Sequence, residues 1–222
     1  MRKFLSVTAF VVPALMAAPV MAQDTTGPWQ IKVLGTAVLP DGEINSVEFD
    51  TVGLPATTQT RANDNYVPTL AIEYFLTPNV SLETICCVTQ HDVDATAGLP
   101  GAELVSDAKL VPATLTVKYH FNPGGLSPYI GAGPTYFLFF DEEPGAATLP
   151  LGITGQNLSN ELGLAVQAGV DIPVGRNFAV SLDAKRYFVG TTATWYAGGT
   201  PRIQTEHDLD PWVLSAGVGV RF

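Results

Sequence analysis

The chain has 222 residues, of which 46% are hydrophobic and 14% charged, and its formal net charge is −10 at pH 7. This acidic balance argues against nucleic acid or an anionic membrane surface as a partner. The two cysteines, Cys86 and Cys87, are adjacent in the sequence, so a bridge between them would staple nothing distant.

The first 22 residues have the three-part pattern of a secretory signal peptide. Arg2 and Lys3 precede a short apolar stretch, and small residues flank the bond that follows Ala22. The stretch is too short for a transmembrane helix, and two prolines interrupt it. We therefore expect cleavage after Ala22, which leaves residues 23–222 as one domain and moves the net charge to −12.

The mature chain contains eight segments whose apolar residues recur at every second position, the period of a β-strand. In segment 113–121, Leu115 and Val117 alternate with Thr116 and Lys118, and the last segment keeps its alternation down to Phe222. Segment 129–140 is apolar on both faces, so the sequence does not assign its inward face. The eight segments are 29–39, 67–76, 80–89, 113–121, 129–140, 161–172, 178–185 and 212–222.

The connections between these segments alternate in length. Long links at 40–66, 90–112, 141–160 and 189–210 alternate with short ones at 77–79, 122–128 and 173–177. An even number of strands of about 9–11 residues, with long and short connections in rotation, is typical of an outer-membrane barrel. The fold class we predict is all-β: an eight-stranded antiparallel transmembrane β-barrel with short periplasmic turns and long extracellular loops.

A secreted soluble sandwich or lipocalin-like barrel also alternates, but it shows its polar face to water. Here the polar set is rich in Gly, Ala, Ser and Thr and poor in Lys, which suits the narrow interior of a small barrel. A barrel without a free edge also explains the end of the chain, because its last strand must pair with the first and face lipid at every second residue.

The inward-facing residues differ between the two halves of the predicted lumen. Charged residues gather in the periplasmic half, where opposite charges packed together should pair and close the pore. This charged floor comprises Lys32, Glu73, Glu83, Lys118, His120, Asp171 and Arg221. Above it we expect an apolar vestibule of Val38, Ile85, Cys87, Ala165 and Val213, with Lys185 and Glu161 as exceptions. Apolar loop residues could form an apolar mouth or simply pack their own loops; they are Leu54, Leu99, Leu149, Leu151 and Ile153.

The sequence offers little for catalysis or metal binding. It has no HExxH, GxSxG or CxxC spacing, and its three histidines are His91, His120 and His207. Ser81 or Ser181 could lie near His120 in the lumen, and the loop histidines have acidic neighbours that could hold a cation or remain solvated. We expect no enzyme, cofactor or metal site.

Several stretches resemble the OmpW family of Gram-negative outer-membrane proteins. They are Pro128-Tyr129-Ile130-Gly131-Ala132-Gly133, Phe139-Phe140-Asp141-Glu142, Ala168-Gly169-Val170-Asp171 and Asp210-Pro211-Trp212-Val213. The resemblance extends over essentially the whole mature chain, and it implies an eight-stranded barrel in the outer membrane with a narrow lumen that passes small hydrophobic molecules. It also implies that the terminal Phe222 resembles the signal read by the outer-membrane assembly machinery.

Together these observations predict a narrow passive channel in the cell outer membrane for small apolar solutes. The charged floor should refuse an apolar molecule, since desolvating paired ions is costly, so the solute should leave sideways into the bilayer. Expected partners are the lipid and lipopolysaccharide of that membrane, its assembly machinery and the solute, with no nucleic acid. A surface receptor or adhesin and a purely structural barrel are the alternatives.

Overall fold

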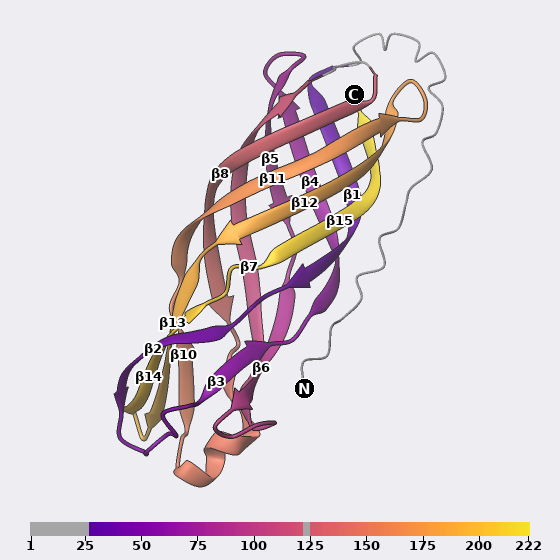
Figure 1. The fold of residues 1–222 in the computed structure, drawn as a ribbon. Helices are drawn as coiled ribbons and strands as arrows, with labels where there is room; N and C mark the ends of the chain where they lie inside the picture. Colours follow the sequence, from indigo (N-terminus) through magenta and orange to yellow (C-terminus); the bar gives the residue numbers. More distant parts are fainter. Residues whose placement is uncertain (1–26, 122–124) are drawn as a thin grey trace, which may run out of the picture.

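Eight antiparallel strands close into a barrel in the computed structural model of the chain, which describes residues 27–121 and 125–222 (Figure 1). Each strand pairs with the next in sequence, and the last pairs with the first. This confirms the predicted fold class. The barrel strands are β1 (Trp29–Leu39), β4 (Asn65–Phe75), β5 (Val80–Cys86), β7 (Glu103–His120), β8 (Ser127–Phe140), β11 (Glu161–Pro173), β12 (Phe178–Phe188) and β15 (Trp212–Arg221).

The two ends of the described barrel meet at its periplasmic rim. The Trp29 amide donates to the Phe222 carbonyl at 3.1 Å, and the Phe222 amide donates to the Trp29 carbonyl at 2.9 Å. The ladder between β1 and β15 therefore extends to the last residue of the chain, where the alternation in the sequence also ends. The predicted signal peptide at 1–22 lies outside the described residues, as does part of the predicted turn at 122–128.

The predicted inward and outward faces are confirmed. Val117 is 53% exposed on the outer wall, whereas its neighbour Thr116 is 1% exposed in the lumen. Strand β8, whose face the sequence left open, turns Tyr129 and Phe137 inward and Ile130 outward. Exposed aromatic residues border the apolar outer wall at both ends, as expected of membrane barrels. They are Trp29, Tyr119, Phe121, Phe178 and Phe222 at one end and Tyr66, Tyr136, Phe140, Phe188 and Trp212 at the other.

Three of the long links, at 40–66, 90–112 and 189–210, consist largely of β-structure that continues the barrel wall, and the link at 141–160 holds two short strands and one short helical turn (Figure 1). Strand β7 accordingly begins at Glu103, ten residues before the predicted segment. The added elements are β2 (Glu43–Asp50), β3 (Gln59–Ala62), β6 (Thr89–Ala97), β9 (Glu143–Pro144), η1 (Ala146–Leu151), β10 (Gly155–Leu158), β13 (Gly190–Ala197) and β14 (Thr200–Asp208). We call them, with the first part of β7, the extracellular extension.

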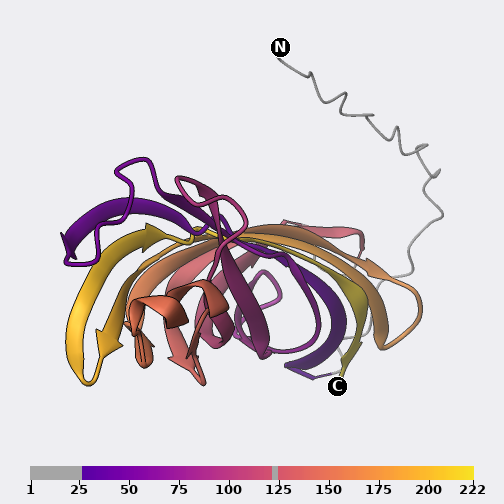
Figure 2. The ribbon, with the colours of Figure 1, turned by 90° about the horizontal axis from the view of Figure 1, so that it is seen from below.

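Two groups of strands build this extension. Strands β3 and β6 join the barrel sheet through the first half of β7, while β10, β13, β14 and β2 form a separate four-stranded sheet. Seen from this end, the short η1 turn lies among the strands at the mouth (Figure 2). Among the residues that the structure describes, no helix has both the length and the apolar character needed to cross a membrane.

In the extension, which lies at the bottom of Figure 1, apolar residues face inward and polar residues outward, the reverse of the arrangement in the barrel. The interior of the extension is an apolar cluster around Trp195, Ile203 and Leu104, while charged residues such as Glu48 and Arg202 face outward. Trp195 is 3% exposed and donates from Nε1 to the Leu104 carbonyl at 3.1 Å. The extension is therefore built as a water-facing wall around its own hydrophobic core, whereas the barrel below turns its apolar side to lipid.

This reversal predicts that a valine-to-lysine substitution will affect stability differently in the barrel and in the extension. Val117→Lys, on the lipid face of β7, should cost about 2–4 kcal/mol of unfolding free energy if the residue lies near the bilayer midplane. The matched control is Val47→Lys on β2, where the valine is 50% exposed on the extension. It should change stability little, because the new charge stays in water. Denaturant unfolding in phospholipid vesicles measures both, and equal costs would contradict the assignment.

Phe222 gives a second prediction. Its deletion removes both backbone hydrogen bonds to Trp29, and Phe222→Asp places a charge at the membrane border. We expect either variant to assemble poorly and to accumulate in the periplasm. Heat-modified mobility of the protein in isolated outer membranes measures assembly, and Phe222→Tyr, which keeps an aromatic ring, is the control. Normal assembly of Phe222→Asp would show that this residue is not needed.

Candidate functional site

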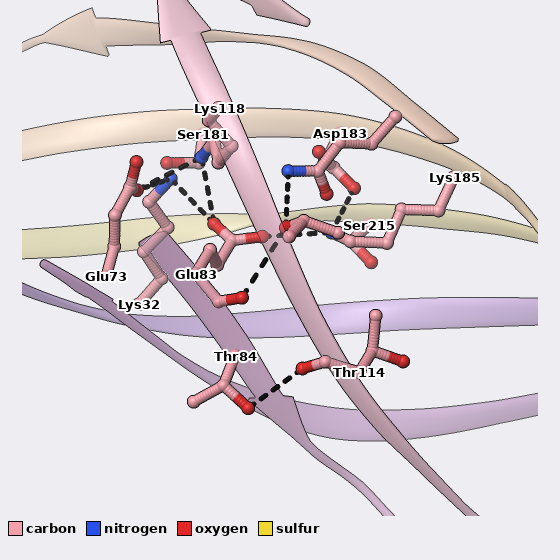
Figure 3. A network of polar contacts seen from close by, with 12 residues as sticks. Lys32, Glu73, Glu83, Thr84, Thr114, Lys118, Ser181, Asp183, Lys185 and Ser215 are labelled. Atoms are coloured by element: carbon pink, nitrogen blue, oxygen red, sulfur yellow. Dashed lines mark hydrogen bonds and ion pairs between the residues drawn. The ribbon is translucent and has the colours of Figure 1, made fainter. Parts of the chain in front are cut away.

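A network of charged side chains fills the periplasmic half of the lumen (Figure 3). Lys118 Nζ lies 3.0 Å from Glu73 Oε2 and 2.9 Å from Glu83 Oε2. Lys32 Nζ lies 2.8 Å from Glu73 Oε2 and 3.4 Å from Glu83 Oε2. These four residues come from β1, β4, β5 and β7, which are consecutive around the wall. The ion pairs therefore join neighbouring strands from the inside, where each buried charge has a partner.

The network continues across the lumen to β11 and β12. Lys32 Nζ lies 3.2 Å from Asp171 Oδ1, and Asp171 also accepts a hydrogen bond from Ser181. Lys185 Nζ lies 2.6 Å from Asp183 Oδ1 and 3.1 Å from Glu83 Oε1 (Figure 3). The alternation in the sequence places Lys185 above the floor and gives no reason to include Asp183. The tilt of the strands and the length of the lysine side chain bring it to Glu83 from the opposite wall. We call Lys32, Glu73, Glu83, Lys118, Asp171, Asp183 and Lys185 the ionic network.

Tyr129 packs against this network, and sequence reasoning missed it. Its hydroxyl donates to Asp183 Oδ2 at 2.8 Å, and its ring centroid lies 3.7 Å from Lys118 Nζ. The ring lies over Gly169, where any Cβ would overlap it. Tyr129 thus stabilises one ammonium group by a cation–π contact while bonding to a carboxylate of the same network. The apolar residues on both faces of its segment concealed this inward position.

The two remaining predicted floor residues lie below the network. His120 Nε2 is 2.9 Å from Glu73 Oε1 and 3.0 Å from Ser81 Oγ, and its Nδ1 is 3.2 Å from Ser127 Oγ. Arg221 is not ion-paired among the described residues; its guanidinium lies 3.7 Å from the Phe75 ring centroid, and its Nε donates to the Gly27 carbonyl. Ser81 does meet His120, as the sequence suggested, but these groups serve to satisfy Glu73 in a packed interior.

The predicted vestibule is filled by side chains. Val38, Ala165 and Val213 pack with further buried residues, among which Phe137 and Tyr187 are both 1% exposed and have ring centroids 5.4 Å apart. Ile85 belongs to a separate small cluster with Leu34 and Ala71, and Cys87 lines the cavity between the two groups. We call the larger cluster the apolar plug; it comprises Val38, Leu110, Phe137, Ala165, Tyr187, Val189 and Val213.

Three small cavities follow one another from the network to the mouth. The lower cavity, about 20 Å³, lies between the ionic network and the plug and is lined by Lys185, Tyr187 and Cys87 among others. The middle cavity, about 50 Å³, shares Val38, Leu110 and Phe137 with it. The outer cavity, about 30 Å³, lies in the extension beside Trp195. Together the three cavities form a mainly apolar series that runs from the extension down to the ionic network.

The predicted mouth residues separate into three groups. Leu54, Leu99 and Leu151 line the outer cavity. Ile153 is 2% exposed within the core of the extension, and Leu149 is exposed and away from that cavity. Three of the leucines thus line a cavity, while Ile153 packs inside the extension.

His91 and His207 lie on the wall of the middle cavity instead of in solvated loops. His91 Nδ1 donates to the Asn63 carbonyl at 2.7 Å, and its Nε2 is 2.9 Å from Thr89 Oγ1. His207 repeats this arrangement with Thr205, whose Oγ1 is 2.6 Å from Nε2. Burial lowers the pKa of both imidazoles below the usual range. No group of acidic, histidine and cysteine residues suited to a metal ion is present in the described part of the chain.

Comparison with known proteins agrees with this architecture. The model of the OmpW family matches residues 25–222. The chain belongs to the OmpW family. An uncharacterized outer-membrane protein of Sinorhizobium fredii, y4mB, is 33% identical, with 94% of this chain and 89% of the relative covered. The crystal structure of OprG from Pseudomonas aeruginosa has a TM-score of 0.81 at 23% identity, covering 91% of this chain and 99% of OprG, which shows the same fold.

A further relative has a name that bears on function. It is the dibenzothiophene metabolism operon protein PahQ of Pseudomonas aeruginosa, 25% identical, with 93% of both chains covered. Membership in this family places the chain in the outer membrane as a non-enzymatic barrel. Outer-membrane barrels have short periplasmic turns and longer extracellular connections, so the ionic network lies toward the periplasm and the middle cavity toward the outside.

His91 and His207 give a prediction about the pH dependence of the extension. A lowered pKa means that the folded extension keeps both imidazoles neutral, while an unfolded chain takes up protons below about pH 6.5. Stability should therefore be constant above that pH and fall as the pH decreases below it. Amide hydrogen exchange in β6 and β14, corrected for the intrinsic pH dependence, should show weaker protection at pH 5 than at pH 7.5. The double variant His91→Gln and His207→Gln should lose this difference, and wild-type protection that does not change with pH would contradict the prediction.

Proposed function

We propose that this OmpW-family barrel takes up small apolar molecules from outside the cell and releases them sideways into the bilayer. The axial route ends at the ionic network, whose lysines and carboxylates are at most 9% exposed. An apolar molecule cannot replace any of these contacts, so separating the ions to let it pass would leave charges unpaired at a high free-energy cost. A solute that reaches the lower cavity needs another exit.

The observation that carries the proposal is a break in the barrel wall beside that cavity. The ladder between β4 and β5 stops at the pair Leu70–Cys86, and that between β5 and β7 stops at Ile85–Thr114. Cys87 and Val88 then leave the strand conformation before β6 begins at Thr89.

Prolines flank this break on both sides. Continuing the two registers places Pro68 opposite Val88 and Pro112 opposite Cys87. Proline has no N–H, so neither residue can donate to the missing ladder, and neither exposes an unsatisfied donor to lipid. On the β4 side, a side-chain hydrogen bond from Asn65 to the Gln90 carbonyl, 2.6 Å long, spans the junction above the gap. The wall can therefore widen here with few hydrogen bonds to lose.

The gap lies between the lower cavity and the surrounding lipid, the two environments that a lateral route must join. Cys86 and Val88 face the lipid side, while Cys87 is buried and lines the lower cavity. The wall at this point is therefore the single layer between the apolar end of the lumen and the hydrocarbon. The operon name of PahQ, which refers to the metabolism of an apolar aromatic compound, supports an apolar solute for this chain as well.

Reversible closure of the gap tests the route. In a Cys86→Ala, Cys87→Ala background, Pro68→Cys and Val88→Cys place two thiols across it. A short bifunctional methanethiosulfonate should then abolish uptake of a labelled alkane into vesicles with a lipopolysaccharide outer leaflet, and a reductant should restore it.

The matched control joins an intact part of the same ladder. Leu70→Cys opposite the native Cys86, in a Cys87→Ala background, gives a cross-link between residues that are already paired. It should leave uptake unchanged. Full uptake with the 68–88 cross-link in place would exclude this exit, and absence of uptake by the wild-type protein would favour a receptor or a structural barrel.

A further inference from the structure

The lower cavity has polar groups on one side, which a route for pure hydrocarbon does not need. Its volume of about 20 Å³ is enough for one group the size of a water molecule. Its lining includes the apolar residues Val38, Ile85 and Phe137 and also Thr69 and Lys185, whose side chains carry a hydroxyl and an ammonium group. The cavity thus offers polar partners to one end of a molecule and apolar contact to the remainder.

Most hydroxyls around this cavity are already bonded to other side chains. Thr36 Oγ1 and Ser215 Oγ lie 2.8 Å apart, and Thr89 Oγ1 is 2.9 Å from His91 Nε2. Thr69 differs from them: it is 4% exposed, and its Oγ1 has no nitrogen or oxygen partner among the residues that the structure describes. Its polar neighbour is the Cys87 thiol, a weak hydrogen-bonding group. A buried hydroxyl without a strong partner is costly, and a ligand oxygen would remove that cost.

Lys185 supplies a second polar group to the lining of this cavity. Its ammonium carries three donors, and its ion-pair partners in the described chain are Asp183 and Glu83. Figure 3 shows Lys185 with these two carboxylates, which belong to the ionic network. Two ion-pair partners leave one of the three donors for a further acceptor, and Lys185 also lines the lower cavity.

We propose that the lower cavity binds the oxygen end of a neutral, singly oxygenated amphiphile, such as a medium-chain alcohol or ketone, before it leaves through the wall. Such an oxygen accepts a hydrogen bond from Lys185 and forms another with the Thr69 hydroxyl. The alkyl chain takes the place of side-chain contacts within the apolar plug. A carboxylate is disfavoured, because it would add negative charge beside Asp183 and Glu83. The inference rests on the proposed function and narrows its solute class. Thr69 lies next to Pro68, so the bound oxygen is already at the exit.

Paired solutes of equal chain length test this inference. Initial rates of 1-octanol and n-octane uptake are measured below saturation in the same vesicles with a lipopolysaccharide outer leaflet. The uptake rates of protein-free vesicles are subtracted. Thr69→Val keeps the shape of the side chain and removes its hydroxyl. It should lower the ratio of octanol to octane uptake by about twofold to tenfold, the effect of one hydrogen bond.

Two further variants separate a hydroxyl effect from a packing effect. Thr69→Ser retains the hydroxyl and should retain the wild-type ratio, and Thr84→Val makes the same change on the exposed face of β5 and should have no effect. An unchanged ratio in Thr69→Val, or an equal fall for both solutes, would overturn the head-group site and leave the lateral route standing. Absence of uptake of either solute by the wild-type protein would instead overturn the proposed function and this inference with it.

Discussion

The constraint on which this structure depends is that hydrocarbon offers no partner to a backbone N–H or C=O group. It requires the eight strands to close, and it explains why the ladder between β1 and β15 extends to the hydrogen bonds of Phe222 with Trp29. The same constraint gives meaning to the gap that Cys87 and Val88 leave in the wall. Pro68 and Pro112 have no backbone N–H, so the interruption of strand pairing at these residues leaves no N–H group unsatisfied there. The two prolines therefore mark this gap in the amino-acid sequence.

Closure then determines the chemistry of the interior. An eight-stranded barrel has room only for side chains, so its inward charges must satisfy one another. Three ammonium groups and four carboxylates do so across six strands. Above them, the rings of Phe137 and Tyr187 take the space that a pore would need. A barrel filled in this way transmits a molecule only where side chains can move aside, and the apolar plug can do so at far lower cost than the ion pairs.

The barrel itself could be predicted from sequence because lipid imposes one strict rule, an apolar residue at every second position. That rule ends at the membrane border, which is why the extension was missed. In β14 the inward residues are Ile203, Thr205 and His207, and the outward ones are polar, so the apolar signal changes face and weakens. Long side chains were a second obstacle. Period-two alternation identifies the face on which Lys185 lies but not how far it reaches, and it cannot orient Tyr129 where both faces are apolar.

The length of β7 has a consequence for where a solute loses its water. Its 18 residues, at roughly 3.4 Å each and tilted by about 45°, rise roughly 40 Å along the membrane normal, against an apolar band of about 25 Å. The wall therefore stands clear of the hydrocarbon by about half its thickness, and the hydrophobic core around Trp195 occupies that height. On the proposed route, an apolar molecule that entered at the outer cavity would be dehydrated inside protein before it reached the depth of the lipid headgroups. On that route the extension would give the molecule a protein-lined path through the hydrated sugar layer, the part of the outer membrane that it crosses least readily on its own.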